Sequence, residues 1–203
     1  MLLSTLPFAI LGYLCGSLTF SIWIVRLLKG VDVRDSGSGH ATTTNAIRQA
    51  GFAVGAVVLV LDVAKGFLPA WLALHYAPLP YRTWIVALTV ACAVAGHCWP
   101  LFAGFRGGMG MATAGGGVLA ASALAFLVGA ALLIFLTLVM RHGARASVVA
   151  GLITAPVYWL LGLRGPEFWI AVFAGVVIAI RFLGDWNRHY SELWLDRKKR
   201  SEE

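Results

Sequence analysis

Charged residues are scarce in this chain. Asp, Glu, Lys and Arg make up 12% of its 203 residues, hydrophobic residues make up 60%, and the mean hydropathy is +0.82. A soluble domain of this size needs far more polar surface to cover its core. The composition therefore excludes an ordinary soluble protein and predicts an all-α integral membrane protein.

Cysteine is also rare. Cys15, Cys92 and Cys98 are the three cysteines, and each lies in an apolar stretch without pairing or metal-ligand spacing. Cysteines in such surroundings usually act as small core residues. They indicate no metal site and carry no information about the redox compartment.

Acidic residues are outnumbered by basic ones, 9 against 16, which gives a formal charge of +7. The cations lie in short loops and in the tail sequence RKKR at 197–200, as the positive-inside rule requires of a membrane protein. We therefore expect membrane lipids with anionic headgroups as partners, and no nucleic acid.

Apolar runs long enough to cross a bilayer, which takes about 20 residues, define the expected spans. They are 6–28, 51–76, 84–105, 107–140, 147–163 and 168–182. The run 107–140 has 34 residues, and a helix of that length would measure about 51 Å, well beyond a hydrocarbon core of about 30 Å. We expect it to form two passes, with a break between Gly115 and Ala125 and a short first helix.

The distribution of charge predicts the orientation of these spans. Cations mark the loops around 26–48, 106 and 141–145 and the C-terminal tail as cytoplasmic, whereas 78–82 and 164–167 carry almost no net charge. Seven spans, with the N-terminus outside and the C-terminus cytoplasmic, satisfy this pattern. Arg26 and Lys29 follow the first span, so it is expected to be a retained helix and not a signal peptide.

The spans are expected to form one compact bundle. Residues 1–203 make a single membrane-embedded domain, of which 191–203 is a polar cytoplasmic tail. Gly12 with Gly16, and Gly51 with Gly55, have the small-xxx-small spacing that allows close helix approach.

A polar segment at 30–51 interrupts the apolar sequence. Hydroxyl, amide and guanidinium groups surround two glycines in it, namely Ser36, Ser38, Thr42, Thr43, Thr44, Asn45, Arg34 and Arg48 around Gly37 and Gly39. Such groups can converge on one anion, so the segment favours a phosphate-binding loop. An ordinary hydrophilic connecting loop is the alternative.

Three further features stand in or beside apolar spans. Asp62 and Lys65 are spaced to pair on one helix face, either as a structural ion pair or as part of a site. His97 is either a hydrogen-bonded core residue or a catalyst. The sequence GFRGGMG at 104–110 ends where a helix is expected to begin, which suits phosphate binding, although a turn or helix packing would also explain its glycines.

Four stretches together identify a family. They are GSLTF at 16–20, DVRDSGSG followed by TNAIRQAG within 32–51, DVAKG at 62–66 and GHCWPLFAGFRGGMG at 96–110. In this order and spacing they resemble the PlsY-type acyl-phosphate:glycerol-3-phosphate acyltransferases of bacterial phospholipid synthesis. The resemblance implies seven spans in the cell inner membrane, a groove open to the cytoplasm, and a monomeric enzyme without metal or other cofactor.

The resemblance also implies the site residues. The catalytic positions fall on Ser38, Arg48 and His97. The positions that bind substrate phosphate, here acyl-phosphate and glycerol 3-phosphate, fall on Thr44, Asn45, Gly107, Gly108, Gly110, Ser147 and Arg188.

The chain departs from the family pattern at several polar positions. Met109 stands where the glycine loop has lysine, His40 replaces an asparagine, and Thr42 replaces a glycine. Phe182 and Asp185 stand where the family has His and Asn, with Arg188 retained.

Two functional classes remain besides the acyltransferase that produces lysophosphatidic acid. The first is a divergent paralogue, which acts on a less anionic acceptor or acyl donor or binds lipid without catalysis. The second is a small transporter, which the intramembrane Asp62 and Lys65 and the helix breaks suggest. It lacks the internal repeat expected of that class.

Overall fold

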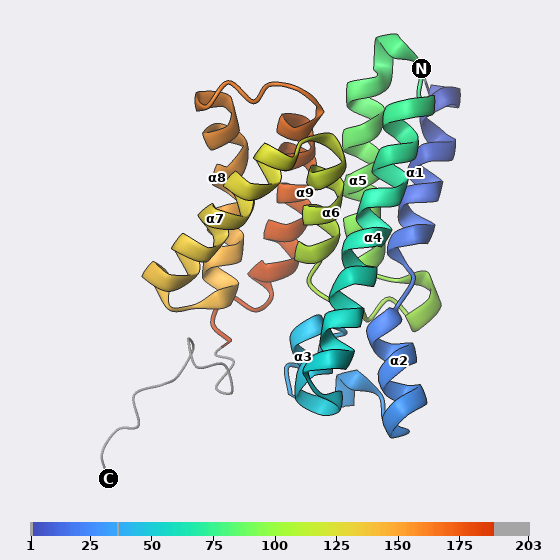
Figure 1. The fold of residues 1–203 in the computed structure, drawn as a ribbon, viewed down its shortest axis with the longest axis vertical. Coiled ribbons are helices and arrows are strands. Elements are labelled where there is room, and N and C mark those ends of the chain that lie inside the picture. Colours follow the sequence, from blue (N-terminus) through green and yellow to red (C-terminus); the bar gives the residue numbers. More distant parts are fainter. Residues whose placement is uncertain (1, 36, 189–203) are drawn as a thin grey trace.

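The computed structural model describes residues 2–35 and 37–188, and every regular element in this part of the chain is helical (Figure 1). The α-helices are α1 (Leu2–Gly16), α2 (Phe20–Lys29), α3 (Thr43–Ala50), α4 (Phe52–Tyr76), α5 (Arg82–Cys98), α6 (Met111–Ala121), α7 (Ala123–Met140), α8 (Gly143–Leu160) and α9 (Pro166–Leu183). Short 3₁₀ turns lie at Val33–Asp35, Leu79–Tyr81 and Leu101–Ala103. Ser36 and the predicted tail 191–203 lie outside the described residues.

Within the described residues, five segments are long and apolar enough to cross a membrane. They are Leu3–Lys29, Phe52–Tyr76, Leu79–Ala103, Ala123–Met140 and Pro166–Leu183. The helix α6 is apolar but has only 11 residues. The helix α8 has 18 residues, yet it does not reach the apolarity of the five segments because it carries Arg145 and several small polar residues.

The expected division of the run 107–140 is confirmed at Ser122. The backbone of Ser122 is extended, and its Oγ accepts a hydrogen bond from the amide of Ala125, which caps α7 at 3.2 Å. The helix before the break is the short one, as predicted. In Figure 1 the chain runs up α6 and back down along α7, so it reverses direction inside what the sequence presents as one apolar run.

The first expected span, 6–28, is not one helix. It divides into α1 and α2 around Ser17–Thr19, within the stretch GSLTF. The break frees the carbonyl of Leu18, which accepts a hydrogen bond of 2.8 Å from Nζ of Lys65 on α4. Ser17 Oγ donates to the carbonyl of Tyr13 at 2.8 Å, so the hydroxyl satisfies another acceptor at the end of α1.

The end of α5 also differs from the expected span 84–105. The helix stops at Cys98 because Pro100 cannot continue it. The segment 99–110 then folds back beneath the helix, and His97 lies in the last turn of α5.

Glycines set the closest helix contacts. Gly12 and Gly16 of α1 face the backbone of Thr89 and Ala93 on α5 so closely that no Cβ would fit, which confirms the predicted small-xxx-small contact. Gly55 meets instead the side chain of Ile47 on the neighbouring α3, and Gly51 forms the turn between α3 and α4 with φ of 92°.

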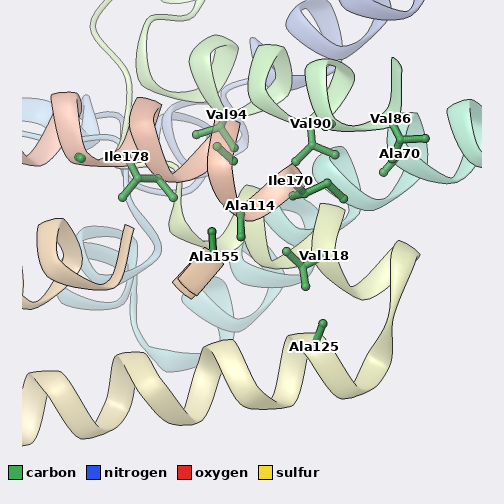
Figure 2. Packing of buried hydrophobic residues seen from close by; sticks show 14 of the residues in the cluster. Ala70, Val86, Val90, Val94, Ala114, Val118, Ala125, Ala155, Ile170 and Ile178 are labelled. Atoms are coloured by element: carbon green, nitrogen blue, oxygen red, sulfur yellow. The ribbon is translucent and has the colours of Figure 1, made fainter. Parts of the chain in front are cut away.

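The main buried cluster joins α4, α5, α6, α8 and α9, and α7 contributes Ala125 to it. Figure 2 shows Val118 of α6 and Ala125 of α7 directed toward one another at its edge. Almost all of the remaining surface of α7 is unburied, with Leu127, Ile134 and Phe135 each at least 60% exposed. Such an apolar outer surface is what a lipid-facing helix requires.

Candidate active site

The polar loops gather at one end of the bundle. In Figure 1 this end holds α2, α3, the segment 99–110, the turn between α7 and α8, and the end of α9, and the N-terminus lies at the opposite end. A cavity of about 490 Å³ opens among these elements. Its wall contains Ser38, His40, Thr42, Thr43, Thr44, Arg48, Asp62, His97, Met109, Gly110, Met111, Ala112, Ser147 and Phe182, among others.

The first polar loop supplies most of the polar wall. Thr42 caps α3 by accepting a hydrogen bond from the amide of Asn45 at 3.3 Å, and this short helix carries Thr44 and Arg48 to the cavity. Ser38 reaches the wall from the turn before it. The structure thus brings together Ser38, Thr44 and Arg48, as the sequence predicted.

Asn45 has a different place. Its side chain is fully buried and outside the cavity wall, and its Nδ2 donates to the carbonyl of Val33 at 2.6 Å and of His40 at 3.2 Å. These bonds tie the start of the loop to its centre. In this structure Asn45 holds the loop that presents Ser38.

The glycine loop divides into a packed part and an open part. The amides of Gly107 and Gly108 donate to the carbonyls of Cys98 at 3.2 Å and His97 at 3.0 Å, and a Cβ on either glycine would collide with residue 97. These two glycines therefore press the loop against α5.

Gly110 forms the open part of the loop. It has φ of 82°, begins α6, and lines the cavity with Met111 and Ala112. The N-terminal turn of α6 is the part of this loop that can offer backbone amides and a positive helix end to an anion.

Arg34 joins the two loops. Its Nη1 donates to the carbonyls of Ala103 and Arg106, both at 2.9 Å, while its Nε and Nη2 donate to Asp32 at 2.9 and 2.7 Å. Hydrogen bonding from Arg34 is the main cause that lowers the pKa of Asp32 from 3.8 to about 2. Arg34 lies outside the cavity wall, and its guanidinium is bound to the carboxylate of Asp32 and to these two carbonyls.

A buried polar cluster lies behind the cavity. Asp62 and Lys65 form the predicted ion pair at 2.9 Å, with both side chains about 3% exposed. His97 Nδ1 lies 3.3 Å from Thr113 Oγ1 and 3.7 Å from Asp62 Oδ1. Asp62 and His97 line the cavity, whereas Lys65 turns to the carbonyl of Leu18. The pair thus serves both helix packing and the cavity wall.

Sequence reasoning missed a second polar bridge. Arg181, in the last turn of α9, donates from Nε to the carbonyl of Gly108 and from Nη2 to Nδ1 of His40, both at 3.0 Å. His40 Nε2 lies 2.7 Å from Asp185 Oδ2. Burial and then the charge of Arg181 lower the pKa of His40 below 6.5, so its neutral ring accepts at Nδ1 and donates at Nε2. The sequence signal that could have revealed this bridge is an arginine, Arg181, at the end of an apolar helix.

The remaining predicted residues differ in position. Ser147 lines the cavity near the start of α8, and its Oγ donates to the carbonyl of Gly143 at 2.9 Å. Arg188 is exposed beyond α9, outside the cavity wall, with Nη1 3.7 Å from Asp185 Oδ1.

Two apolar side chains stand where the family pattern has polar ones. Met109 and Phe182 are 7% and 6% exposed, belong to the same hydrophobic cluster, and both line the cavity. With Leu59, Met111 and Leu133 they form the apolar part of the cavity wall, opposite the polar side chains of the first loop.

The helical bundle and its cavity define a class of protein, the all-helical membrane protein with a polar pocket at one end. A family model described as glycerol-3-phosphate acyltransferase matches residues 6–192. The chain therefore belongs to the glycerol-3-phosphate acyltransferase family.

Individual relatives agree with this assignment. Glycerol-3-phosphate acyltransferase 2 of Thermotoga maritima is 38% identical over 154 residues, which cover 76% of this chain and 77% of that protein. The crystal structure of PlsY (YgiH), an integral membrane glycerol 3-phosphate acyltransferase, in its glycerol 3-phosphate form has a TM-score of 0.78 at 35% identity, covering 91% of both chains. Its lysophosphatidic acid form has a TM-score of 0.76 at 34% identity over the same shares.

Proposed function

We propose that this protein transfers a fatty acyl group from acyl-phosphate to the sn-1 hydroxyl of glycerol 3-phosphate and so forms lysophosphatidic acid. The observation that carries the proposal is the cavity in which Ser38, Arg48 and the N-terminus of α6 meet. The solved relatives are described in forms with glycerol 3-phosphate and with lysophosphatidic acid. An acceptor phosphate and an acylated product both suit this cavity.

The proposed reaction exchanges one acyl–oxygen bond for another. The acceptor oxygen attacks the acyl carbonyl, the bond from that carbonyl to the phosphate oxygen breaks, and inorganic phosphate leaves. Arg48 and Ser38, which belong to the first polar loop, bind the substrate's phosphate dianion on one side. The first amides of α6 bind the same phosphate on the other side. Groups fixed in this way stabilise the charge that develops during transfer.

The proton of the attacking hydroxyl needs an acceptor. In our proposal the phosphate of the acceptor substrate takes it, which agrees with the absence of a nucleophile paired with a base in the described cavity wall. His97 is the alternative general base, because it reaches the cavity and its Nδ1 is held near Thr113. His97→Gln separates the two assignments, since only a general-base role predicts that the variant loses the acidic limb of the pH dependence of kcat.

The direct test uses purified protein, radiolabelled acyl-phosphate and glycerol 3-phosphate. Labelled lysophosphatidic acid is the expected product, and omission of glycerol 3-phosphate is the control. If a relative assayed in parallel forms product and the folded protein forms none, the proposed reaction is refuted.

The apolar wall formed by Met109 and Phe182 favours a second candidate function. A less anionic acceptor, or lipid binding without catalysis, would suit a cavity that has lost two polar side chains. Competition between glycerol 3-phosphate and uncharged alcohols of similar size tests this candidate. Transfer that prefers the uncharged alcohol would support it.

We also propose seven membrane passes, with an external N-terminus and a cytoplasmic C-terminus, in the inner membrane, and a monomeric protein. Five apolar segments, the reversal at Ser122 and the presence of α8 support the number of passes. Arg26, Lys29, Arg106 and Arg141 all lie at the end that holds the cavity, which supports a cytoplasmic active site.

A further inference from the structure

A second cavity adjoins the first. It has a volume of about 160 Å³ and lies among α6, α7, α8 and α9. Met111 and Leu133 line both cavities, so the two are neighbours that share part of their walls. The second cavity extends from the polar one toward the opposite end of the bundle.

One face of each surrounding helix forms this path. On α7, Thr137 and Leu133 line the polar cavity, and Leu133, Ala130 and Phe126 line the second one. The spacing of three or four residues keeps them on one side of the helix. From Thr137 to Phe126 the path rises about 16 Å at about 1.5 Å per residue.

The wall of the second cavity is almost entirely apolar. Thr154 and Tyr158 carry its two hydroxyls, and each donates to a backbone carbonyl, Thr154 to Ala150 at 2.6 Å and Tyr158 to Ala125 at 2.5 Å. Burying apolar surface against another apolar group removes it from water and is favourable. The chemistry of this wall therefore suits a hydrocarbon.

Side-chain size determines the length of the path. Ala130 and Gly115 leave room in its middle, while Val118, Phe126, Tyr158 and Ile170 bound the far end. Val118, Tyr158 and Ile170 are buried, so packed side chains stand at this end. A guest that grows by single methylenes would meet Phe126 and Tyr158.

We propose that the second cavity binds the distal part of the donor's acyl chain, and that Ala130 and Phe126 determine the chain length the enzyme accepts. This inference rests on the proposed acyl transfer, because the reacting acyl carbonyl must lie beside Ser38 and Arg48. From there the chain passes Met111 and Leu133 into the cavity.

Two neighbouring alanines provide a matched test. Ala130 lines the cavity, whereas Ala131 is exposed on the lipid-facing side of α7. Ala130→Leu should lower kcat/KM for palmitoyl-phosphate about tenfold or more relative to octanoyl-phosphate. Ala131→Leu makes the same chemical change and should leave this ratio unchanged.

Phe126→Ala tests the far end in the opposite direction. It should raise the ratio of stearoyl to palmitoyl transfer, because the path becomes longer. Thermal unfolding of each variant in detergent verifies folding. A chain-length profile that is the same in wild type, Ala130→Leu and Phe126→Ala overturns the proposal, as does an equal shift in Ala131→Leu.

Photo-crosslinking tests acyl-chain binding in the second cavity separately from the proposed acyl-transfer reaction. A hydrolysis-resistant palmitoyl phosphonate with a terminal diazirine should label peptides that contain Phe126 or Tyr158, even if the protein turns over no acyl-phosphate. Excess unlabelled phosphonate should suppress the label. Labelling confined to the outer face of α7, or labelling that competitor does not reduce, refutes acyl-chain binding in this cavity.

Discussion

Replacing Met109 by lysine adds a positive charge to the cavity wall beside the N-terminus of α6. Met109 is 7% exposed, so the new ammonium group would be largely removed from water. The charge of Arg181 lies close by, because its Nε bonds to the carbonyl of the preceding Gly108. Without a bound anion the substitution should therefore destabilise the protein.

A bound phosphate reverses this balance. A hydrogen bond between a charged donor and an anion contributes about 1.5–3 kcal/mol, which corresponds to roughly ten- to hundredfold in affinity. Burial and repulsion from Arg181 oppose this gain, so we expect the lower end of that range. Met109→Lys should lower the KM for glycerol 3-phosphate about tenfold.

Two measurements on the same samples test this reasoning. Steady-state kinetics gives KM, and thermal unfolding with and without glycerol 3-phosphate gives the ligand-dependent stabilisation, which should be larger in the variant. Leu101→Lys, at an exposed position in the same segment, is the control for added charge. An unchanged or raised KM, with the fold intact, would show that no phosphate lies near residue 109. Loss of the native reaction with a gain in glycerol 3-phosphate binding would instead favour the less anionic acceptor.

Three other predictions follow from the loops and the topology. Arg48→Ala should abolish acyl transfer without affecting membrane insertion, because Arg48 supplies a cation to the polar wall. Arg106→Ala, at an exposed position, is the control and should retain activity. Near-normal turnover in Arg48→Ala would contradict the prediction. Asp32 has a folded pKa of about 2 against 3.8 when unfolded, so it stabilises the fold above about pH 4, and this contribution disappears as the pH falls toward 2. In Asp32→Asn the free energy of unfolding should not fall between about pH 4 and pH 2 by the part that Asp32 contributes. Identical stability–pH profiles of the variant and the wild type would contradict this prediction. Reporter fusions should read outside after Pro80 and Gly165, and inside after Gly39 and Gly143, and an external reading at Gly143 would contradict seven passes.

Local chemistry explains what the sequence predicted well. A run too long for one bilayer crossing, with small residues in its middle, indicated the reversal at Ser122. The glycine loop was expected to end where a helix begins, and α6 does begin directly after Gly110. These features depend on residues close together in the chain. Ser38, Arg48 and His97 line the cavity, and their place in the site had been implied by the resemblance to the family.

Contacts with distant backbone carbonyls could not be predicted in this way. Lys65 bonds to the carbonyl of Leu18, and Arg34 to the carbonyls of Ala103 and Arg106. A carbonyl is present at every residue, so no side-chain pattern identifies the one that will be chosen. For the same reason the break between α1 and α2 was missed, since its stabilising partner lies on α4.

The departures from the family pattern become intelligible once they are placed in space. His40 and Asp185 each stand where the pattern has asparagine, and they contact one another at 2.7 Å across the loop and the end of α9. Met109 and Phe182 stand where it has lysine and histidine, and they share one hydrophobic cluster. Four separate substitutions thus form one polar pair and one apolar group. If each pair changed together, His40→Asn and Asp185→Asn should each weaken glycerol 3-phosphate binding, and the double variant should weaken it less than their sum, as expected for residues in direct contact. Additive losses in a double-mutant cycle would show that the two positions act independently.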